Sequence, residues 1–364
     1  MKLFMLSDPE SIHTKRWISS LSERGIEIFL FGIGKKDDEF YGKCKNTSVY
    51  TLDYKTKFRS SSVEKIIYLL ALNNLKKKIR DFQPDILHAH YASSYGLLGV
   101  LTRFHPLIIS VWGSDVYSFP KISILHRAIL KYNLSKADQL LSTSNIMVGE
   151  ISKYTSAPIQ ITPFGVDLNL FKKMDSIIQQ DKFIVGTVKA LSVIYRIDII
   201  LKSFKKVIDN NPKIKLKLKI IGDGPEKEEL KSLTISLGIE KNVDFLGRIE
   251  NKLLPDFYNS FSVFVSVSDS ESFGVVAIEA MACECPVIVS DADGFIEVVK
   301  NEETGIIVPR GDVDATAHAI QRLINDRSLG EKMGLQGRER VERLYDWNEN
   351  VDKMLKIYQT LLSH

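Results

Sequence analysis

Two glutamates, Glu271 and Glu279, are the residues of this sequence whose placement most clearly suggests chemistry. Glu271 lies in a polar segment, residues 268–272, that follows an apolar run at 263–267, and Glu279 lies in the helical pattern that starts near Phe273. A helix that begins where a strand ends presents unpaired N–H groups and about half a positive charge, which suit a phosphate or diphosphate. Carboxylates accept hydrogen bonds from sugar or ribose hydroxyls. The segment therefore favours a ligand that combines phosphate with hydroxyl groups.

Gly274 and the surroundings of Glu279 sharpen this prediction. Gly274 has no side chain, so a ligand can approach the backbone closely at the start of the helix. Glu279 stands among apolar residues at 276–281, and a charge in so apolar a stretch needs a partner. A helix with a capping serine and a satisfied buried glutamate is the purely structural alternative.

Glycines and cations follow three other apolar runs of the second half. Gly222 and Gly224 come after the run 216–221, where small residues permit close approach of a base or ribose, although Gly-x-Gly-Pro also makes an ordinary turn. Lys189 follows the run 183–188, and Arg196 comes later in the same loop. Each is either a cation for a phosphate or a solvated loop cation. Arg248 follows the run 243–246.

Imidazole, phenol and carboxylate groups occupy the corresponding positions of the first half. His13 precedes the helical pattern at 14–24, where it can donate to a phosphate, act on an acceptor or be an ordinary surface residue. His90 and Tyr91 follow the run 85–88, and Asp115 follows the run 107–111. Because ligands gather at the carboxyl ends of parallel strands, we expect these residues to face a ligand. His88 alternates to the other face, as a core histidine would.

The elements that must position these groups alternate between short apolar runs and helical patterns over 364 residues. This alternation predicts βαβ units and parallel sheets covered on both faces, and each half is long enough for one doubly wound sheet. We predict an α/β fold of two Rossmann-like domains, residues 1–168 and 169–345. The break at 163–167 and the polar stretch at 172–181 mark the boundary, and a helix over 346–364 is expected to cross back to the first domain.

The composition is that of an ordinary soluble globular protein, with 44% hydrophobic and 26% charged residues. The three cysteines form neither a disulfide framework nor a zinc pattern, so we expect a reducing, cytoplasmic compartment and no zinc site. The first residues turn polar too early for a signal peptide, and no apolar run approaches the roughly 18 residues of a membrane span.

Charge is distributed unevenly between the halves. Residues 1–180 carry 24 Lys and Arg against 16 Asp and Glu, whereas residues 181–364 carry 25 against 29. A basic half favours an anionic partner such as an acidic membrane surface or a polyphosphate, or it is simply a solvated surface; we expect no nucleic acid. Segments 66–80 and 121–131 combine apolar and basic residues, which suits either contact with an anionic membrane or a core-facing stripe with a solvated rim.

The spacing from Glu271 to Glu279, followed by Ala-Met-Ala-Cys and Pro-Val, resembles the E-x7-E motif of the family-4 retaining glycosyltransferases, or glycosyl transferases group 1. The resemblance implies the GT-B fold, in which two Rossmann-like domains face each other across a cleft. It implies that Glu271 contacts the hydroxyls of the donor sugar and Glu279 those of the ribose. The backbone of Ser272, Phe273 and Gly274 would hold the diphosphate.

The family also places a basic pair after the first strand of its second domain. Lys189 fits the first place, whereas Ile194-Tyr195-Arg196 stands where Lys-Tyr-Gly is commoner, so we assign the second cation to Arg196. The segments around Gly222 and Arg248 resemble the family's G-x-G-P segment and the next strand end, whose backbone reads the base.

Other positions depart from the family pattern. Trp112 replaces the histidine of the family's H-G-x-D, although Asp115 remains and can bind a hydroxyl. Ser11-Ile12-His13 stands where many members have Gly-Gly, as in a subset with a histidine just before the helix. Glu284 replaces a usual glycine past the helix, where it should affect the turn more than the chemistry.

The resemblance implies a retaining, metal-independent transfer of a sugar from a nucleotide-sugar donor, which we expect to be UDP-linked, with no other cofactor. The acceptor would be a saccharide or a lipid-linked saccharide, as in bacterial surface polysaccharide assembly. The catalytic residues would be Glu271, Lys189, Arg196 and His13, and the acceptor side would include His90, Tyr91 and Asp115. A nucleotide-sugar epimerase of the same two-domain fold is the alternative reaction, since such enzymes need no acceptor.

Overall fold

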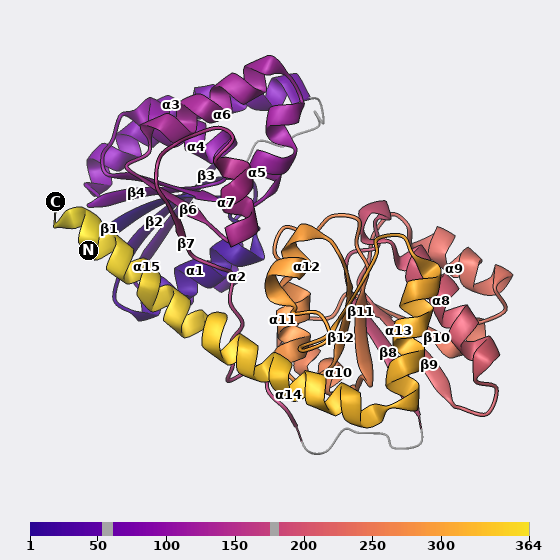
Figure 1. Cartoon of the computed structure of the whole chain (residues 1–364). Helices are drawn as coiled ribbons and strands as arrows, with labels where there is room; N and C mark the ends of the chain where they lie inside the picture. The colour runs from indigo at the N-terminus through magenta and orange to yellow at the C-terminus, as the bar shows by residue number, and fades with distance from the viewer. Residues whose placement is uncertain (53–60, 175–181, 364) are drawn as a thin grey trace. The chain divides into compact units, whose positions relative to one another are not determined.

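The computed structural model describes residues 1–52, 61–174 and 182–363, except for the side chains of residues 61–70. Part of the polar stretch expected at the domain boundary, residues 175–181, therefore lies outside the described residues. The chain divides into two compact units, one formed by Met1–Pro163 with Asn348–His364 and the other by Phe164–Trp347. Each unit is built on one parallel sheet with helices on both faces (Figure 1).

The first unit contains a seven-stranded sheet in the order β3-β2-β1-β4-β5-β6-β7. The strands are β1 (Lys2–Leu6), β2 (Glu27–Ile33), β3 (Thr47–Leu52), β4 (Ile86–His90), β5 (Leu107–Val111), β6 (Gln139–Ser142) and β7 (Ile159–Ile161). The helices are α1 (Ile12–Glu23), α2 (Asp38–Tyr41), α3 (Ser61–Phe82), α4 (Ser94–Thr102), α5 (Ser114–Tyr117), η1 (Phe119–Lys121), α6 (Ile124–Lys136), α7 (Asn145–Ile151) and α15 (Trp347–Leu362). Strands β4 and β5 are buried along their whole length because helices cover both faces of the sheet.

The second unit contains a six-stranded sheet in the order β10-β9-β8-β11-β12-β13. The strands are β8 (Phe183–Val188), β9 (Leu216–Ile221), β10 (Val243–Gly247), β11 (Val263–Ser266), β12 (Val287–Ser290) and β13 (Ile306–Val308). The helices are η2 (Val193–Tyr195), α8 (Ile197–Asn210), α9 (Lys227–Ser236), η3 (Glu240–Asn242), η4 (Asn251–Leu253), α10 (Leu254–Ser260), α11 (Val275–Ala282), α12 (Asp293–Val298), α13 (Val313–Asn325) and α14 (Arg327–Leu344).

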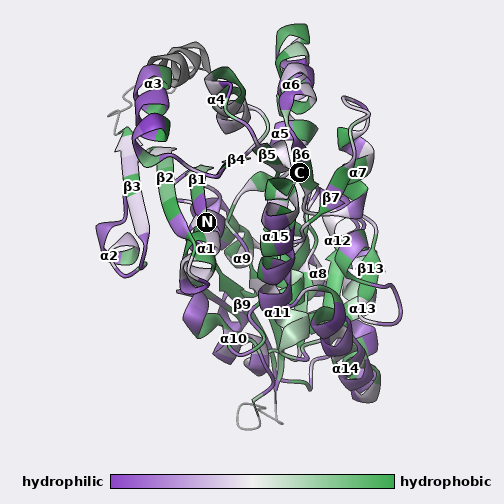
Figure 2. Ribbon diagram, turned by 90° about the vertical axis from the view of Figure 1, so that its left-hand side faces the viewer, coloured by the Kyte–Doolittle hydropathy of each residue, from purple (hydrophilic) through white to green (hydrophobic). Residues whose placement is uncertain are grey.

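Helix α8 shows how the sequence specifies these layers. Its buried residues Ile197, Ile200, Leu201, Phe204 and Val207 recur at helical spacing and form one stripe that packs into the core of the second unit. The strands of both sheets are hydrophobic along much of their length in Figure 2, as expected when helices cover both faces. Truncating a fully buried ring such as that of Phe204 to alanine is expected to cost about 3–5 kcal/mol of stability.

Both sheets contain a point at which the strand order reverses direction. In the first sheet this point lies between β1 and β4, and in the second it lies between β8 and β11. Loops leave a parallel sheet in opposite directions at such a point, so a crevice forms outside the carboxyl ends of the two strands. The architecture thus directs attention to the residues that follow β1, β4, β8 and β11.

The last helix, α15, packs with the first unit. Tyr358 Oη lies 2.8 Å from His88 Nδ1 of β4, and Arg24 Nε donates to Asp352 Oδ1 at 2.7 Å. Both contacts join residues more than 250 positions apart. The contact between Tyr358 and His88 is buried, so the end of the chain contributes to the core of the first unit, whereas the pair of Arg24 and Asp352 lies at the surface.

Candidate functional site

The segment from Val267 to Gly274 connects β11 to α11 and is held in place by its neighbours. Ser290 Oγ of β12 donates to the carbonyl oxygen of Ser268 at 2.6 Å. The N–H of Gly294 in α12 donates to the carbonyl oxygen of Glu271 at 2.9 Å. A side chain at position 294 would collide with the backbone of Phe273, since its Cβ would lie 2.4 Å from the Phe273 nitrogen. Gly294 therefore lets α12 support this segment, and no local motif in the sequence indicates this role.

The start of α11 has the features of an anion site. Gly274 caps the helix with φ +97°, a conformation that suits glycine, and a Cβ there would lie 2.9 Å from the Phe295 ring. Among the residues that the structure describes, no acceptor receives a hydrogen bond from the backbone N–H of Ser272, Phe273 or Gly274. The helix begins at Val275, so these amides precede its positive end.

Lys189 and Glu271 form an ion pair across the reversal point of the second sheet. Lys189 follows β8 and Glu271 follows β11, and the Lys189 ammonium donates to Glu271 Oε2. Both side chains are largely buried, and the Lys189 ammonium also lies 4.7 Å from the centre of the Tyr195 ring. The pair thus places a cation and a carboxylate in direct contact beside the start of α11.

The partner that Glu279 requires is provided by two polar side chains of neighbouring elements. Tyr258 Oη of α10 donates to Glu279 Oε2 at 2.9 Å, and Asn251 Nδ2 donates to Oε1 at 3.2 Å. Burial, together with the adjacent Glu279 carboxylate, raises the pKa of Tyr258 well above its usual value, so this hydroxyl remains a donor. The sequence indicates that a partner is needed, but Tyr258 and Asn251 come from other elements.

The two glycines after β9 make room for the backbone that follows β8. A Cβ at Gly222, where φ is +140°, would lie 1.8 Å from the carbonyl oxygen of Lys189, and one at Gly224 would lie 2.3 Å from that of Leu191. These glycines thus allow the loops after β8 and β9 to lie against each other. Arg248 follows β10, and its side chain is exposed.

Arg196 is a paired cation in this structure. It has φ +50° at the start of α8, and its guanidinium contacts the carboxylates of Asp198 and Asp269. The hydrogen bond to Asp198, followed by that to Asp269, raises the pKa of Arg196. At position 194, where the resembling family commonly has lysine, the side chain is that of an exposed isoleucine.

The residues predicted on the first unit form an aromatic cluster around Trp112. The Trp112 ring lies 4.4 Å from the ring of His90, 5.3 Å from that of Tyr91 and 5.7 Å from that of His13. His13 lies in the first turn of α1 rather than before it, because the helix begins at Ile12. Trp112 thus stands where the family pattern has a histidine, and its larger and more apolar ring contacts three other aromatic rings.

The histidines of this cluster, together with His88 next to His90, are neutral at physiological pH. Burial lowers the pKa of His13 to about 4, with Arg16 adding to the effect, and burial lowers that of His88 to about 3. Burial also lowers the pKa of His90, whose side chain is 1% exposed beneath Trp112 and lies 3.0 Å from Ser7 Oγ through Nδ1. Ser7 follows β1 and His90 ends β4, so this contact spans the reversal point of the first sheet.

Asp115 is buried and joins the loops that follow β4 and β5. Its carboxylate accepts the N–H groups of Ala92 and Gly113, each at 2.8 Å, and that of Trp112 at 3.3 Å. Burial raises the pKa of Asp115, against the lowering influence of these N–H groups. Its observed contacts are therefore with the backbone that carries Tyr91 and Trp112.

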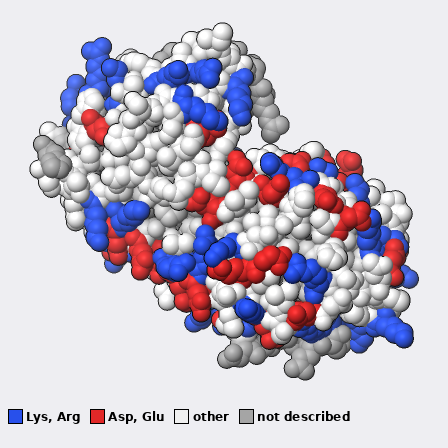
Figure 3. All heavy atoms as spheres, in the orientation of Figure 1, with Lys and Arg blue, Asp and Glu red and all other residues white. Residues whose placement is uncertain are grey.

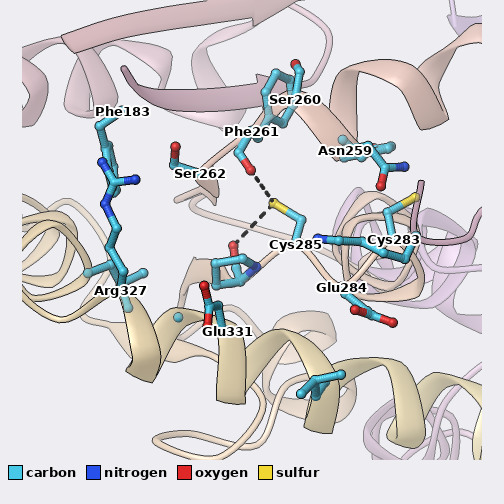
Figure 4. Close-up of a pocket in the computed structure, with 16 residues that line it drawn as sticks. Phe183, Asn259, Ser260, Phe261, Ser262, Cys283, Glu284, Cys285, Arg327 and Glu331 are labelled. Atoms are coloured by element: carbon cyan, nitrogen blue, oxygen red, sulfur yellow. Dashed lines mark hydrogen bonds between the residues drawn. The ribbon is translucent and has the colours of Figure 1, made fainter. Parts of the chain in front are cut away.

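A separate cavity of about 350 Å³ lies at the amino-terminal edge of the second sheet (Figure 4). Phe183, Ser262 and Pro286, at or just before the first residues of β8, β11 and β12, line it. Cys285 Sγ lies 3.6 Å from the Pro286 carbonyl oxygen, and burial raises the pKa of this thiol. Because ligands of such folds gather at the opposite edge, and the thiol is protonated, this cavity is distinct from the candidate site.

No group of three or more His, Cys, Asp or Glu side chains in the described part of the chain is arranged to hold a metal ion. None of the helices, within that same part, combines the length and apolar character needed to cross a membrane.

Comparisons with known proteins agree with this architecture. Residues 171–340 match the family model described as "Glycosyl transferases group 1", and residues 2–144 match "Glycosyl transferase 4-like". The capsular polysaccharide biosynthesis glycosyltransferase CapM of Staphylococcus aureus is 34% identical over 209 residues, which are 57% of this chain and 54% of that protein. The chain thus spans about half the length of that relative.

Two solved structures share the fold over nearly the whole chain. Sucrose-phosphate synthase from Thermosynechococcus elongatus superposes with a TM-score of 0.86 at 22% identity, covering 100% of this chain and 99% of that one. HepE of Anabaena, solved in complex with UDP, superposes with a TM-score of 0.82 at 17% identity, covering 99% of each chain. Both structures show that the chain shares their fold, which consists of two Rossmann-like units with one parallel sheet each.

Proposed function

The chain belongs to the group 1 glycosyltransferases, the GT-B enzymes with family-4-like domains, and from that premise we propose that it transfers a sugar from a UDP-sugar to a saccharide acceptor with retention of configuration. One observation carries the proposal: the Lys189–Glu271 ion pair lies beside the free amides that precede α11. This arrangement offers positive charge to a diphosphate and a carboxylate to sugar hydroxyls.

The charges of the site suit the donor's diphosphate. The Lys189 ammonium and the N–H groups of Ser272, Phe273 and Gly274 supply the positive potential that a leaving nucleotide requires. Glu271 binds the donor sugar, and Glu279, held by Tyr258 and Asn251, binds the ribose hydroxyls. With these groups in place, the proposed transfer requires neither a metal ion nor another cofactor.

The proposed transfer takes place on one face of the donor sugar. The acceptor hydroxyl oxygen forms a bond to the anomeric carbon while the bond from that carbon to the phosphate oxygen breaks. The acceptor proton passes to the leaving phosphate oxygen, so no strong side-chain base is needed. The contribution of the protein is orientation and stabilisation of the developing phosphate charge.

Two relatives support the choice of substrates. HepE was solved with UDP, which favours uridine as the nucleotide, and CapM is named for capsular polysaccharide biosynthesis, which favours a saccharide acceptor of a cell-surface polymer. In the first unit, the proposed acceptor contacts are the cluster of His13, Tyr91 and Trp112, with His90 and Asp115 behind it. Neutral imidazoles and aromatic faces suit an uncharged sugar.

A mutational experiment tests the donor assignment. The full chain is titrated with UDP by calorimetry, and its turnover is measured with the nucleotide-sugar that gives the largest thermal shift in a screen. Glu279→Ala is expected to weaken UDP binding at least about tenfold, because a buried charge-assisted contact is lost. Glu284→Gln, which changes a carboxylate just past α11, serves as the matched control and should bind as the wild type does. Unchanged affinity in Glu279→Ala, or conversion of the donor alone into a new sugar isomer, contradicts the proposal.

An exposed apolar segment supports a lipid-linked acceptor. Ile122, Ile124 and Leu125, at the start of α6, are 65%, 89% and 64% exposed, so this part of the predicted core-facing stripe is not buried. Residues 116–137 contain no acidic side chain, and their cations are Lys121, Arg127, Lys131 and Lys136. In Figure 3, Lys and Arg side chains gather over α3 and α6 with few acidic ones among them. The segment suits the surface of an anionic membrane.

The proposed membrane contact, at the cytoplasmic face of the cell membrane, is tested with vesicles. The full chain should float with vesicles that contain phosphatidylglycerol and remain unbound with pure phosphatidylcholine. The double variant Ile124→Ser with Leu125→Ser should lose this binding, whereas Ile235→Ser, at a 68% exposed position on α9, should retain it. Equal recovery with both lipid compositions, or unchanged binding of the double variant, overturns the membrane contact.

A further inference from the structure

Arg196 connects two parts of the second unit through its guanidinium. Nε donates to Asp198 Oδ1 at 3.0 Å within the first turn of α8, and Nη1 donates to both carboxylate oxygens of Asp269 at 3.2 Å. Asp269 precedes Glu271 by two residues in the segment between β11 and α11. The guanidinium thus ties the start of α8 to the segment that carries the proposed sugar-binding carboxylate.

Asp269 is also held through its backbone. Its N–H donates to the carbonyl oxygen of Ile194 at 2.8 Å, and its own carbonyl oxygen accepts from Arg310 Nη1 at 3.2 Å. Arg310 is in turn fixed by Asp291, whose Oδ1 accepts from the Arg310 Nε at 3.0 Å. Residues that follow β8, β12 and β13 therefore converge on a single aspartate of the β11–α11 segment.

The backbone and charge of Arg196 argue against a direct role on phosphate. At φ +50° the residue adopts a conformation that glycine tolerates and arginine rarely takes, so the contacts of its side chain must offset a backbone cost. A guanidinium shared by two carboxylates has little net positive charge left to offer a third anion. Both observations favour a role that depends on Asp269.

We infer that Arg196 is a positioning residue, which acts through Asp269 to hold residues 268–272 where Glu271 and the amides before α11 meet the donor diphosphate. This inference rests on the proposed function and changes the assignment of Arg196 from a phosphate contact to a support of the phosphate-binding segment. Lys189 then remains the cation that contacts the donor directly.

The test compares variants of both partners in the full chain, with UDP as the probe in calorimetric titrations. Arg196→Gln and Asp269→Asn should each weaken UDP binding about tenfold, the loss expected when a charge-assisted contact is removed. Because both act through one contact, the double variant should bind no more weakly than either single variant. Asp269→Glu, which keeps the charge, should restore most of the affinity.

A matched control distinguishes the contact that Arg196 makes with residues 268–272 from its contact within α8. Asp198→Asn removes the other carboxylate partner of Arg196, which belongs to α8 and not to the segment, and should change UDP affinity by less than about threefold. The thermal midpoint of each variant verifies that the unit is folded. A direct phosphate contact predicts instead that Asp269→Asn binds UDP more tightly, since it releases the guanidinium, and that result overturns the inference.

Two outcomes distinguish this inference from the proposed function. If the wild-type chain binds neither UDP nor inorganic pyrophosphate, the proposed donor site itself is wrong. If the wild type binds UDP and Asp269→Asn binds it equally well, only the positioning role of Arg196 is wrong. A loss of thermal stability in Arg196→Gln without loss of UDP affinity likewise contradicts the positioning role.

Discussion

The two units share one sheet architecture but place chemically different side chains at the point where the strand order reverses. In both, polar side chains meet where the strand order reverses, through Ser7 and His90 in the first unit and through Lys189 and Glu271 in the second. The first unit places buried neutral imidazoles and aromatic rings there, whereas the second places ion pairs and free amides. The same fold thus presents uncharged polar groups in the first unit and charged groups in the second.

The difference follows from the ligands that we propose for each unit. A diphosphate requires fixed positive potential, and a site that holds its charges in pairs before binding needs little reorganisation. A sugar hydroxyl carries no charge and both donates and accepts hydrogen bonds, and a neutral histidine provides one donor and one acceptor from a single ring.

The largest effect is expected at Glu271. Glu271→Gln should lower kcat about 10²–10³-fold, as is typical when a polar group that acts on the reacting part of a substrate is removed. UDP affinity should be retained or increased, because Lys189 loses the carboxylate that competes with phosphate. Steady-state kinetics together with UDP titration measure both quantities. Equal losses of kcat and of UDP affinity contradict the division of roles between Glu271 and Lys189.

A smaller effect is expected when the pH is lowered, because the first unit should lose stability. The folded pKa of His88, about 3, lies below its ordinary value of 6.5, so the unfolded chain binds more protons as the pH falls and stability is lost below pH 6.5. Between pH 7.5 and pH 5 this one histidine should account for about 2 kcal/mol of lost unfolding free energy. Urea unfolding at the two pH values measures the loss.

The control for this prediction is His88→Gln, which can still bond to Tyr358 and Ser110 but does not titrate. The difference in unfolding free energy between the two pH values should shrink in this variant. A pH dependence equal to that of the wild type means that His88 is not the group responsible.

The smallest effect is expected at Glu284, where a substitution should change the unfolding free energy only slightly. Glu284 lies just past the end of α11 with φ +57°, where the family has glycine, so Glu284→Gly should raise the unfolding free energy by about 0.5–1 kcal/mol. Glu284→Gln removes the charge but keeps the backbone cost, and it should leave stability unchanged. Urea unfolding of the two variants separates backbone from charge, and stabilisation by the glutamine variant instead points to electrostatics.

Much of the fold could be predicted from sequence because buried parallel strands appear as continuous apolar runs. Strands β3 and β7 do not appear as continuous apolar runs, since each lies at an edge of the first sheet and consists mostly of partly exposed residues. An edge strand needs apolar residues on fewer positions, so its pattern is weaker. The last helix, by contrast, shows a clear helical period, and its observed bounds of Trp347–Leu362 match that pattern.

The residues of the candidate site were named from sequence, but their partners were not. The motif from Glu271 to Glu279 identifies both carboxylates, whereas Tyr258 and Asn251 lie on other elements that only the fold brings close. The pairing of Arg196 with Asp269, likewise, joins residues 73 positions apart and shows that a cation placed by motif alignment can already be engaged. Long-range pairing of this kind carries no local signal.

The contrast between the units is tested most directly by titrating UDP into two variants of the full chain in parallel. Lys189→Gln, in the charged unit, should weaken UDP binding at least about tenfold, as expected for loss of a cation that contacts phosphate. His90→Gln, in the neutral unit, should bind UDP as the wild type does. If Lys189→Gln binds UDP normally, or if His90→Gln loses as much affinity, the diphosphate is not held where we propose.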